Sequence, residues 1–226
     1  MLNLPMPEEA RWRDDIAQAL ALDGRERLVL KLILSRGTGG RGYAPPSPAQ
    51  PRRLVQTFDW PVFPGAQAIE GASVILCSTR LGLNPLLAGV KHLNRLEQVL
   101  AAAEVQTAGA DEGLMQDITG HLVEGTRTNL FLIRGRQLLT PSLEHAGIRG
   151  VTRDILLELA PSVGLEPREV AVTLEMLLSA DEACLANSVI GLWPLKALLG
   201  EKTREWTSGV AVARLQARLQ EHDATA

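Results

Sequence analysis

Apolar and polar positions along the chain repeat with a period that changes from segment to segment. A period near about 3.6 residues predicts helices, whereas alternation or short apolar runs between turn residues predict strands. We expect helices at residues 6–22, 93–104, 151–164, 173–179 and 209–221. We expect strands at residues 28–35, 53–58, 73–79, 113–118, 121–123, 128–134, 137–140 and 168–172, and two more within 183–196. Because the order lacks regular βαβ alternation, the pattern predicts an α+β fold.

Two stretches interrupt this pattern and suggest how the chain divides. Residues 37–51 are dense in Gly and Pro and predict an irregular loop, and a second Pro-broken stretch begins at Asp59. We therefore expect a small domain at residues 1–58, a linker at 59–66 and a large domain at 67–226. Within the large domain, the helix at 93–104 is expected to place Leu93, Leu96, Val99 and Leu100 on one side.

Composition narrows the class of protein. Of 226 residues, 46% are hydrophobic and 22% charged, which is typical of a globular chain with a real core. Lys and Arg total 23 against 26 Asp and Glu, so the net charge of −3 argues against a nucleic-acid partner. No apolar stretch approaches the about 18 residues of a membrane span, and the first residues turn acidic where a signal peptide is apolar. With only two distant cysteines, we expect an unprocessed cytoplasmic protein without a membrane partner.

One familiar motif is present but lies in the wrong context. Gly37, Gly39 and Gly42 match G-x-G-x-x-G directly after a predicted strand. Dinucleotide binding also needs a helix to begin at once behind the glycines, and the sequence Tyr-Ala-Pro-Pro at 43–46 forbids one. The chain contains no G-x-x-x-x-G-K-[ST], H-E-x-x-H or G-x-S-x-G motif, and its four histidines lack metal-ligand spacing.

A lysine and a glutamate are candidates for chemistry. Lys91 follows an apolar turn and leads into a predicted helix, where desolvation would lower its pKa towards the neutral nucleophile of a Schiff base. Glu124 lies between two predicted strands, where a carboxylate either faces a cofactor or is simply solvated. Spacing alone leaves both alternatives open, since most lysines and turn carboxylates are exposed.

Two segments are candidates for binding an anion. Gly150, Val151 and Thr152 open a predicted helix, whose free N–H groups bind phosphate or serve only as a structural cap. Asn187 and Ser188 end a predicted strand in a turn, where they donate to a phosphate or satisfy their own backbone. A lysine, a carboxylate and two phosphate-type donors together form a coherent set for pyridoxal phosphate.

The sequence around the lysine resembles a known family. Residues 80–100, RLGLNPLLAGVKHLNRLEQVL, closely resemble the aminodeoxychorismate lyases, which are fold-type IV pyridoxal-phosphate enzymes. Further similarity lies at residues 35–43, 111–112, 124–131, 147–153 and 186–188, so that the resemblance covers about residues 25–200. It implies a two-domain α+β fold, a large domain that binds the cofactor, and a homodimer.

The resemblance also assigns roles. Lys91 is expected to carry the cofactor covalently and to move the proton beside the imine, and Glu124 is expected to pair with the pyridine nitrogen. The residues expected to hold the phosphate are Val151, Thr152 and Ser188, with Asn187 beside them. Asn94 and Arg95 are expected along the cofactor's edge. Arg41, on the predicted loop, is a candidate for binding the substrate's carboxylates, because guanidinium groups bind carboxylates in a fork.

The implied reaction converts aminodeoxychorismate to para-aminobenzoate and pyruvate in folate biosynthesis. Family members usually begin with a further segment that supplies the first strands of the small domain and an arginine for the cofactor phosphate, so residues 1–58 are expected to be a remnant of that domain. Two alternatives remain open. One is a branched-chain or D-amino acid aminotransferase that uses the same lysine and glutamate, and the other is a non-catalytic remnant.

Overall fold

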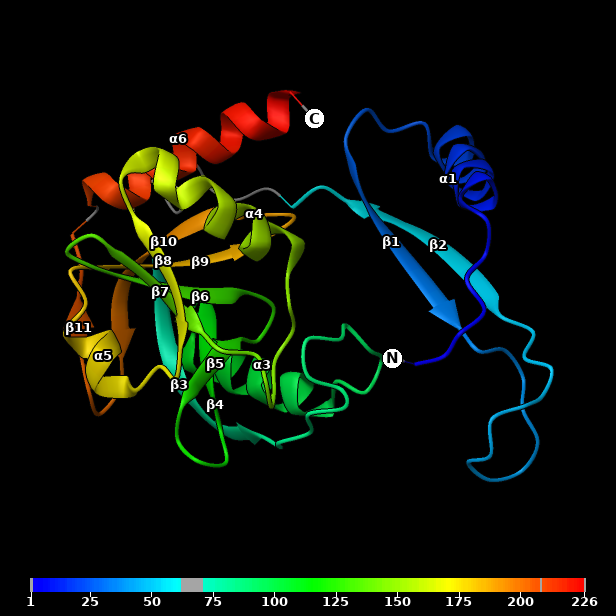
Figure 1. The fold of residues 1–226 in the computed structure, drawn as a ribbon, viewed down its shortest axis with the longest axis horizontal. Coiled ribbons are helices and arrows are strands. Elements are labelled where there is room, and N and C mark those ends of the chain that lie inside the picture. Colours follow the sequence, from blue (N-terminus) through cyan, green and yellow to red (C-terminus); the bar gives the residue numbers. More distant parts are fainter. Residues whose placement is uncertain (1, 62–70, 208, 226) are drawn as a thin grey trace. The chain divides into compact units, whose positions relative to one another are not determined.

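The computed structural model describes residues 2–61, 71–207 and 209–225. The chain divides into two compact units, Met1–Val62 and Phe63–Ala226 (Figure 1). Residues 62–66 of the expected linker lie outside the described residues.

The first unit is a helix followed by a two-stranded sheet. Helix α1 (Glu9–Asp23) ends at Gly24, whose φ of 72° lies in the left-handed region that glycine adopts without strain. Strands β1 (Leu28–Ser35) and β2 (Arg52–Asp59) pair antiparallel along their whole length. An ion pair between Arg53 and Asp15 joins β2 to α1. As predicted, the Gly- and Pro-rich loop between the strands contains neither helix nor strand.

The second unit is built on a sheet whose strands close into a ring. These strands are β3 (Ala72–Leu81), β4 (Glu112–Asp117), β5 (Leu122–Gly125), β6 (Asn129–Arg134), β7 (Gln137–Pro141), β8 (Glu166–Val170), β9 (Glu182–Asn187), β10 (Gly191–Leu199) and β11 (Arg204–Glu205). Their order is β11-β10-β3-β4-β5-β6-β7-β8, and β9 pairs with both β10 and β6. Since β9 joins the two, strands β10, β3, β4, β5, β6 and β9 form a closed barrel.

Helices cover the barrel on two sides. Helix α3 (Leu96–Ala108) packs on β3 and β4. Helices α4 (Val151–Leu159) and α6 (Val210–Thr225) pack together on β9, away from α3 (Figure 1). A 3₁₀ turn at Ala160–Val163 follows α4, and the short α5 is Leu174–Leu178. Among the described residues no helix is both long and apolar enough to span a bilayer.

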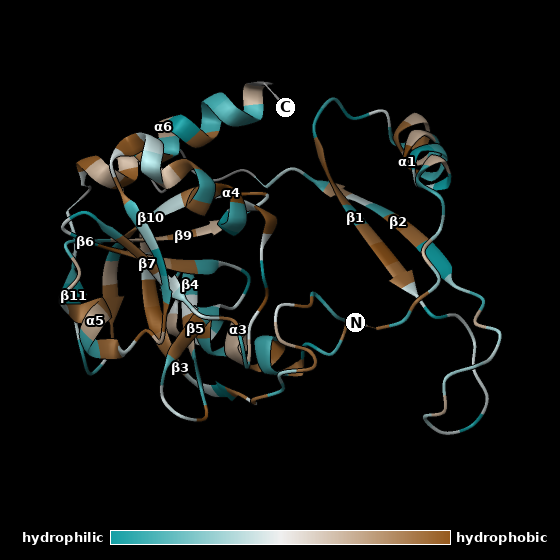
Figure 2. Ribbon diagram, in the orientation of Figure 1, coloured by the Kyte–Doolittle hydropathy of each residue, from teal (hydrophilic) through white to brown (hydrophobic). Residues whose placement is uncertain are grey.

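Strand β6 is apolar on both faces, which explains its unbroken hydrophobic run (Figure 2). In β6, Leu130 and Leu132 pack into one core cluster. The alternate side chains, Phe131 and Ile133, pack into a second cluster under α4 and α6. A third cluster lies under α3 and includes Ala101.

Most predicted elements are present, and two of the differences have a clear physical cause. Strand β8 begins at Glu166 and not at residue 168, because its parallel pairing with β7 fixes its register. The short strand β11 was not predicted. Helix α3 begins at Leu96 and not at residue 93, because the preceding residues form a turn. The predicted apolar side of this helix is exposed, whereas Gln98 and Ala101 are buried.

Candidate active site

Glu124 is buried in the barrel wall. It lies within strand β5, and not between strands as predicted, and its side chain is only 2% exposed. Its Oε2 accepts a hydrogen bond from Ile148 N at 2.7 Å, and its Oε1 accepts one from Gln98 Nε2 at 3.2 Å. Burial raises the pKa of Glu124 to about 7, against the opposing effects of these two donors and of the charges on Arg95 and Lys91. A buried carboxylate of this kind favours a further positive partner.

The segment that carries Lys91 is attached to the segment that contacts Glu124. Gly89 N donates to Gly147 O at 2.9 Å, and Arg149 N donates to Gly89 O at 3.1 Å, so Gly89 forms a parallel bridge with Ile148. Lys91 follows two residues later, and its side chain is exposed. Of the two alternatives that spacing left open for Lys91, the structure shows the exposed one, with the residue in a loop on the surface.

Arg95 folds back over the same loop. Its Nη2 donates to Val90 O at 2.6 Å and its Nε donates to His92 O at 3.0 Å, so the guanidinium group contacts the backbone on both sides of Lys91. Burial lowers the pKa of Arg95, although the charges of Glu124 and Glu97 oppose this effect. The sequence-based expectation placed Arg95 and Asn94 at the edge of a cofactor, and that placement stays a prediction.

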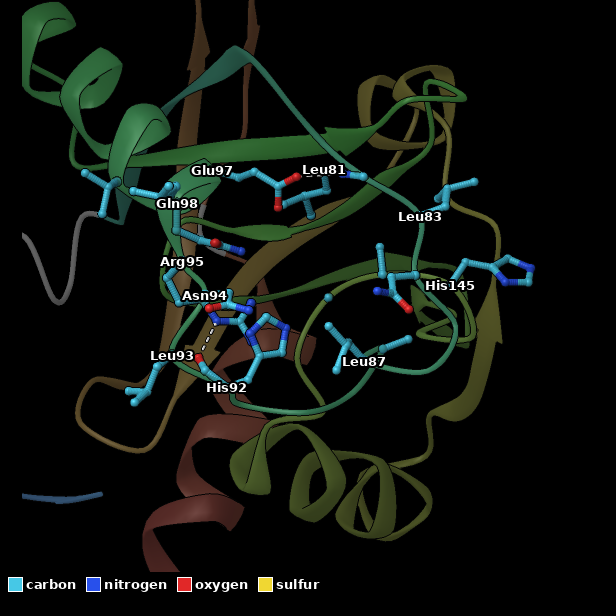
Figure 3. Close-up of a pocket in the computed structure, with 17 residues that line it drawn as sticks. Leu81, Leu83, Leu87, His92, Leu93, Asn94, Arg95, Glu97, Gln98 and His145 are labelled. Carbon is cyan, nitrogen blue, oxygen red and sulfur yellow. Dashed lines mark hydrogen bonds between the residues drawn. The ribbon is translucent and has the colours of Figure 1, made fainter. Parts of the chain in front are cut away.

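A hollow of about 720 Å³ lies beside these residues (Figure 3). Parts of three segments line it, at residues 81–88, 92–99 and 145–147. Arg95 and Gln98 both reach it from the start of α3, and Asn94 is an exposed residue of its wall. Two buried polar atoms of its lining, His92 Nδ1 and Gln98 Oε1, have no hydrogen-bond partner among the described residues. The hollow is of the size that small molecules occupy.

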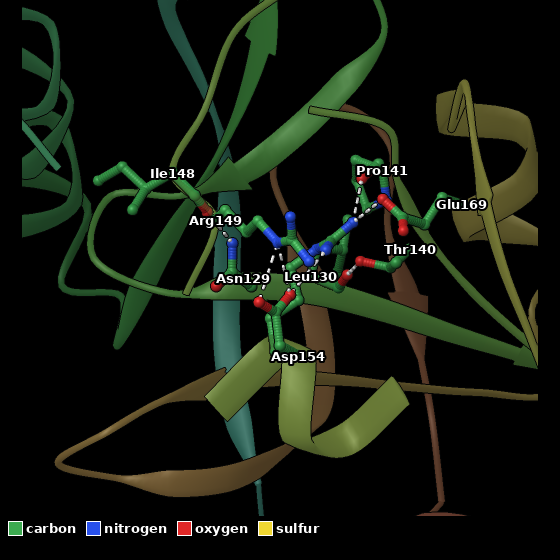
Figure 4. Close-up of polar contacts among 9 residues, drawn as sticks. Asn129, Leu130, Thr140, Pro141, Ile148, Arg149, Asp154 and Glu169 are labelled. Carbon is green, nitrogen blue, oxygen red and sulfur yellow. Dashed lines mark hydrogen bonds and ion pairs between the residues drawn. The ribbon is translucent and has the colours of Figure 1, made fainter. Parts of the chain in front are cut away.

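Asn129 connects Glu124 to the start of α4. It pairs with Glu124 across β5 and β6, and with Ala186 across β6 and β9. Its Nδ2 donates to Ile148 O at 2.8 Å (Figure 4). Its Oδ1 lies so close to Gly150 that a Cβ atom there would collide with it. The loop from Gly147 to Gly150 is therefore held against the same row of strands that carries Glu124.

The start of α4 has the features of an anion site. Gly150 precedes the first helical residue, and no side chain caps the helix. The N–H groups of the first turn, at Val151 and Thr152, thus have the chemistry that binds phosphate at helix N-termini. Thr152 is buried and Val151 is exposed.

Oppositely charged side chains form ion pairs around the start of α4. Arg149 Nε contacts Asp154 Oδ2 at 2.9 Å (Figure 4). The buried Arg153 contacts Glu169 Oε2 at 2.6 Å and donates to Pro141 O at 3.1 Å. The contacts of Arg153 fix α4 against β7 and β8.

The structure distinguishes between the two alternatives for Asn187. Its Oδ1 accepts hydrogen bonds from Val189 N at 2.9 Å and Ile190 N at 2.8 Å, and its Nδ2 donates to Arg127 O at 3.1 Å. The Asn187 side chain therefore satisfies the turn between β9 and β10. Ser188, in that turn, is exposed.

The described residues bring part of the predicted set together. Lys91, Glu124 and the start of α4 are linked through the loop at residues 147–150. Arg41 is exposed and belongs to the first unit. Sequence reasoning missed Gln98 and Asn129. Only Asn129, at the start of the apolar run of β6, had a visible signal in the sequence.

Comparisons with known proteins agree with this architecture. The model of the class IV amino-transferase family matches residues 1–198. An aminodeoxychorismate lyase of Vibrio harveyi is 34% identical over 96% of this chain and 80% of its own length. A branched-chain-amino-acid aminotransferase of Escherichia coli K12 is 30% identical over 83% of this chain and 62% of its own length.

The solved structures agree as well. The crystal structure of 4-amino-4-deoxychorismate lyase from Pseudomonas aeruginosa is 41% identical, with a TM-score of 0.88 over 96% of this chain and 78% of that chain. The expectation of an α+β, fold-type IV architecture is confirmed. From its sequence and its fold, the chain belongs to the class IV aminotransferase family.

Proposed function

We propose that the protein is a pyridoxal-phosphate-dependent lyase that converts aminodeoxychorismate to para-aminobenzoate and pyruvate, and thus acts in folate biosynthesis. The observation that carries the proposal is the buried Glu124 beside the Lys91 loop and the uncapped start of α4. The relatives that are named as lyases, 34% and 41% identical, support this reaction over others of the family.

The residues fit the cofactor on chemical grounds. Among the described residues, no cationic side chain forms an ion pair with Glu124, so a protonated pyridine nitrogen would supply the positive partner that this carboxylate lacks. The first-turn N–H groups of Val151 and Thr152 would hold the phosphate, with Ser188 as a further donor. Asn94 and Arg95 are proposed along the cofactor's edge. When bound, pyridoxal phosphate supplies an aldehyde for covalent attachment and a ring that accepts electrons.

The chain's own residues then hold charges and move protons. Lys91 Nζ would carry the cofactor and, with the substrate amine in its place, would be the base that removes the proton from the carbon beside that amine. Glu124 would hold the proton on the ring nitrogen of the bound cofactor, which would keep the ring a strong electron acceptor. Arg41 is proposed to bind a carboxylate of the substrate.

A branched-chain or D-amino acid aminotransferase is the second candidate, and the 30% identity to the Escherichia coli enzyme favours it. The two activities differ in their need for an acceptor. Pyruvate released from aminodeoxychorismate without any added keto acid supports the lyase, whereas absolute dependence on an acceptor supports the aminotransferase.

The cofactor site is tested by covalent trapping. The purified chain is mixed with pyridoxal phosphate, reduced with borohydride and mapped by peptide mass spectrometry. We expect the adduct at Lys91, loss of the adduct in Lys91→Arg, and an unchanged adduct in Lys202→Arg, whose lysine is exposed elsewhere on the unit. An adduct that persists in Lys91→Arg, or a chain without any adduct, would contradict the proposal and leave the non-catalytic alternative.

We also propose that the protein acts as a homodimer on a small-molecule substrate. The exposed apolar side of α3, which includes Leu96 and Val99, supports a second copy as its cover.

A further inference from the structure

We propose that the start of α3 positions the two reacting groups of the site, with Arg95 fixing the backbone of Lys91 and Gln98 fixing the carboxylate of Glu124. This inference rests on the proposed function of Lys91 and Glu124. Within its proposed place at the cofactor's edge, Arg95 then acts through the backbone of Lys91 and not by binding the cofactor directly.

Lys91 is the central residue of a three-residue turn. His92 N donates to Val90 O at 3.0 Å, which closes the backbone around Lys91. Arg95 Nη2 donates to the same Val90 oxygen at 2.6 Å, and Arg95 Nε donates to His92 O at 3.0 Å. Because the bridge between Gly89 and Ile148 holds the chain just before this turn, the backbone of Lys91 is fixed from both directions.

Only an arginine can make both contacts. The guanidinium group presents its N–H donors in a rigid plane, so that Nε and Nη2 reach two carbonyl oxygens at once. A lysine carries one ammonium group on a flexible chain and cannot hold two separate carbonyls in the same way. The two bonds therefore determine where the exposed Lys91 side chain leaves the surface, although that side chain itself is not packed.

Gln98 lies three residues further along and holds the second group. Residues three apart lie on the same side of a helix, so Arg95 and Gln98 both face the hollow beside Glu124. Gln98 is 8% exposed and donates from Nε2 to Glu124 Oε1 at 3.2 Å. Its Oε1 has no hydrogen-bond partner among the described residues, and leaving a buried acceptor unpaired is unfavourable. A glutamine in this position is therefore explained by its donor group, which binds Glu124.

Two probes separate positioning from direct binding. Pyridoxal phosphate needs the Lys91 amine for attachment, whereas pyridoxamine phosphate has the same ring and phosphate but no aldehyde. We expect Arg95→Gln to slow formation of the borohydride-trapped Lys91 adduct by about tenfold or more, since two charge-assisted hydrogen bonds are lost. The affinity of the Arg95→Gln variant for pyridoxamine phosphate, measured by calorimetry, should stay within about twofold of that of the wild type.

Three variants complete the comparison. Arg95→Lys keeps the charge without the fork and should resemble Arg95→Gln. Arg168→Gln, at an exposed arginine of β8, should behave as wild type. Gln98→Leu should weaken both probes alike, by about tenfold, because both contain the ring that Glu124 faces.

The outcomes are distinct. Equal loss of both probes in Arg95→Gln would make Arg95 a cofactor ligand and overturn the inference, as would wild-type behaviour of Arg95→Lys. Unchanged binding of both probes in Gln98→Leu would overturn the part assigned to Gln98. A thermal transition matching that of wild type shows that each variant folds. Failure of the wild-type chain to bind either probe would overturn the proposed function itself, and this inference with it.

Discussion

At the scale of the residue, Glu124 is expected to make the stability of the cofactor-free chain depend on pH. Its pKa rises on folding from the ordinary glutamate value of 4.5 to about 7. At pH values between these two, the folded state therefore binds more protons than the unfolded state. The penalty for burying its charge is absent below pH about 4.5 and grows as pH rises through about 7. Stability contributed by this residue is thus lost with rising pH.

Glu124→Gln removes this dependence because the amide does not ionise. Between pH 5 and 8 the variant's free energy of unfolding, measured by urea titration, should rise by about 2 to 3 kcal/mol relative to wild type. Glu158→Gln, at an exposed position of α4, controls for the loss of one negative charge. Parallel curves for wild type and Glu124→Gln would show that Glu124 does not titrate in this range.

Single residues were predicted to the extent that their role is local. Val151 and Thr152 were correctly expected at a helix start, because Gly150 and the following period are visible in the sequence. The burial of Glu124, the exposure of Lys91 and the contacts of Gln98 depend on residues distant along the chain. Such contacts have no signature in hydrophobic spacing, and they account for most of the errors at the site.

At the scale of the element, the start of α4 depends on the lack of a side chain at Gly150. A Cβ there would collide with Asn129 Oδ1, although the φ of −73° suits any residue. Gly150→Ala should therefore lower the free energy of unfolding by about 1 to 3 kcal/mol, the usual effect of overpacking. In an Asn129→Ala background the same change should cost less than about 0.5 kcal/mol.

A double-mutant cycle by thermal or urea unfolding measures this coupling. Gly40→Ala is the matched control, since none of the described residues places an atom within 4 Å of a Cβ at Gly40. Additive effects of Gly150→Ala and Asn129→Ala would show that the two positions do not interact, and that α4 begins at Val151 for another reason.

Whole elements were predicted better than the sides they bury. Strands β1 and β6 follow directly from apolar runs between turn residues. Helix α3 was also expected, but not that Gln98 and Ala101 would face the barrel while its leucines face outward. Local hydrophobicity identifies an apolar side of a helix but does not identify which surface covers that side.

At the scale of the whole molecule, that outward side of α3 is expected to be the centre of a homodimer. Leu96 is 77% exposed and Val99 is 61% exposed within one chain, and Leu93 and Leu100 are exposed beside them. Contiguous apolar side chains on a surface generally mark a contact with another protein. The hollow at the start of α3 shares Leu93, Leu96 and Val99 with this side, so a second copy there would also border the candidate site.

Leu96→Glu tests the dimer because it places a charge in the centre of that contact and alters no buried residue. We expect the wild-type protein to have the mass of a dimer by light scattering, and Leu96→Glu to have that of a monomer at the same concentration, since an unpaired buried charge strongly disfavours association. Leu22→Glu is the control, because Leu22 is 89% exposed on α1 in the other unit. A Leu96→Glu variant that remains dimeric would place the contact between the two copies on a different surface. An equal loss of dimer in Leu22→Glu would show that added charge alone, and not its position on α3, separates the copies.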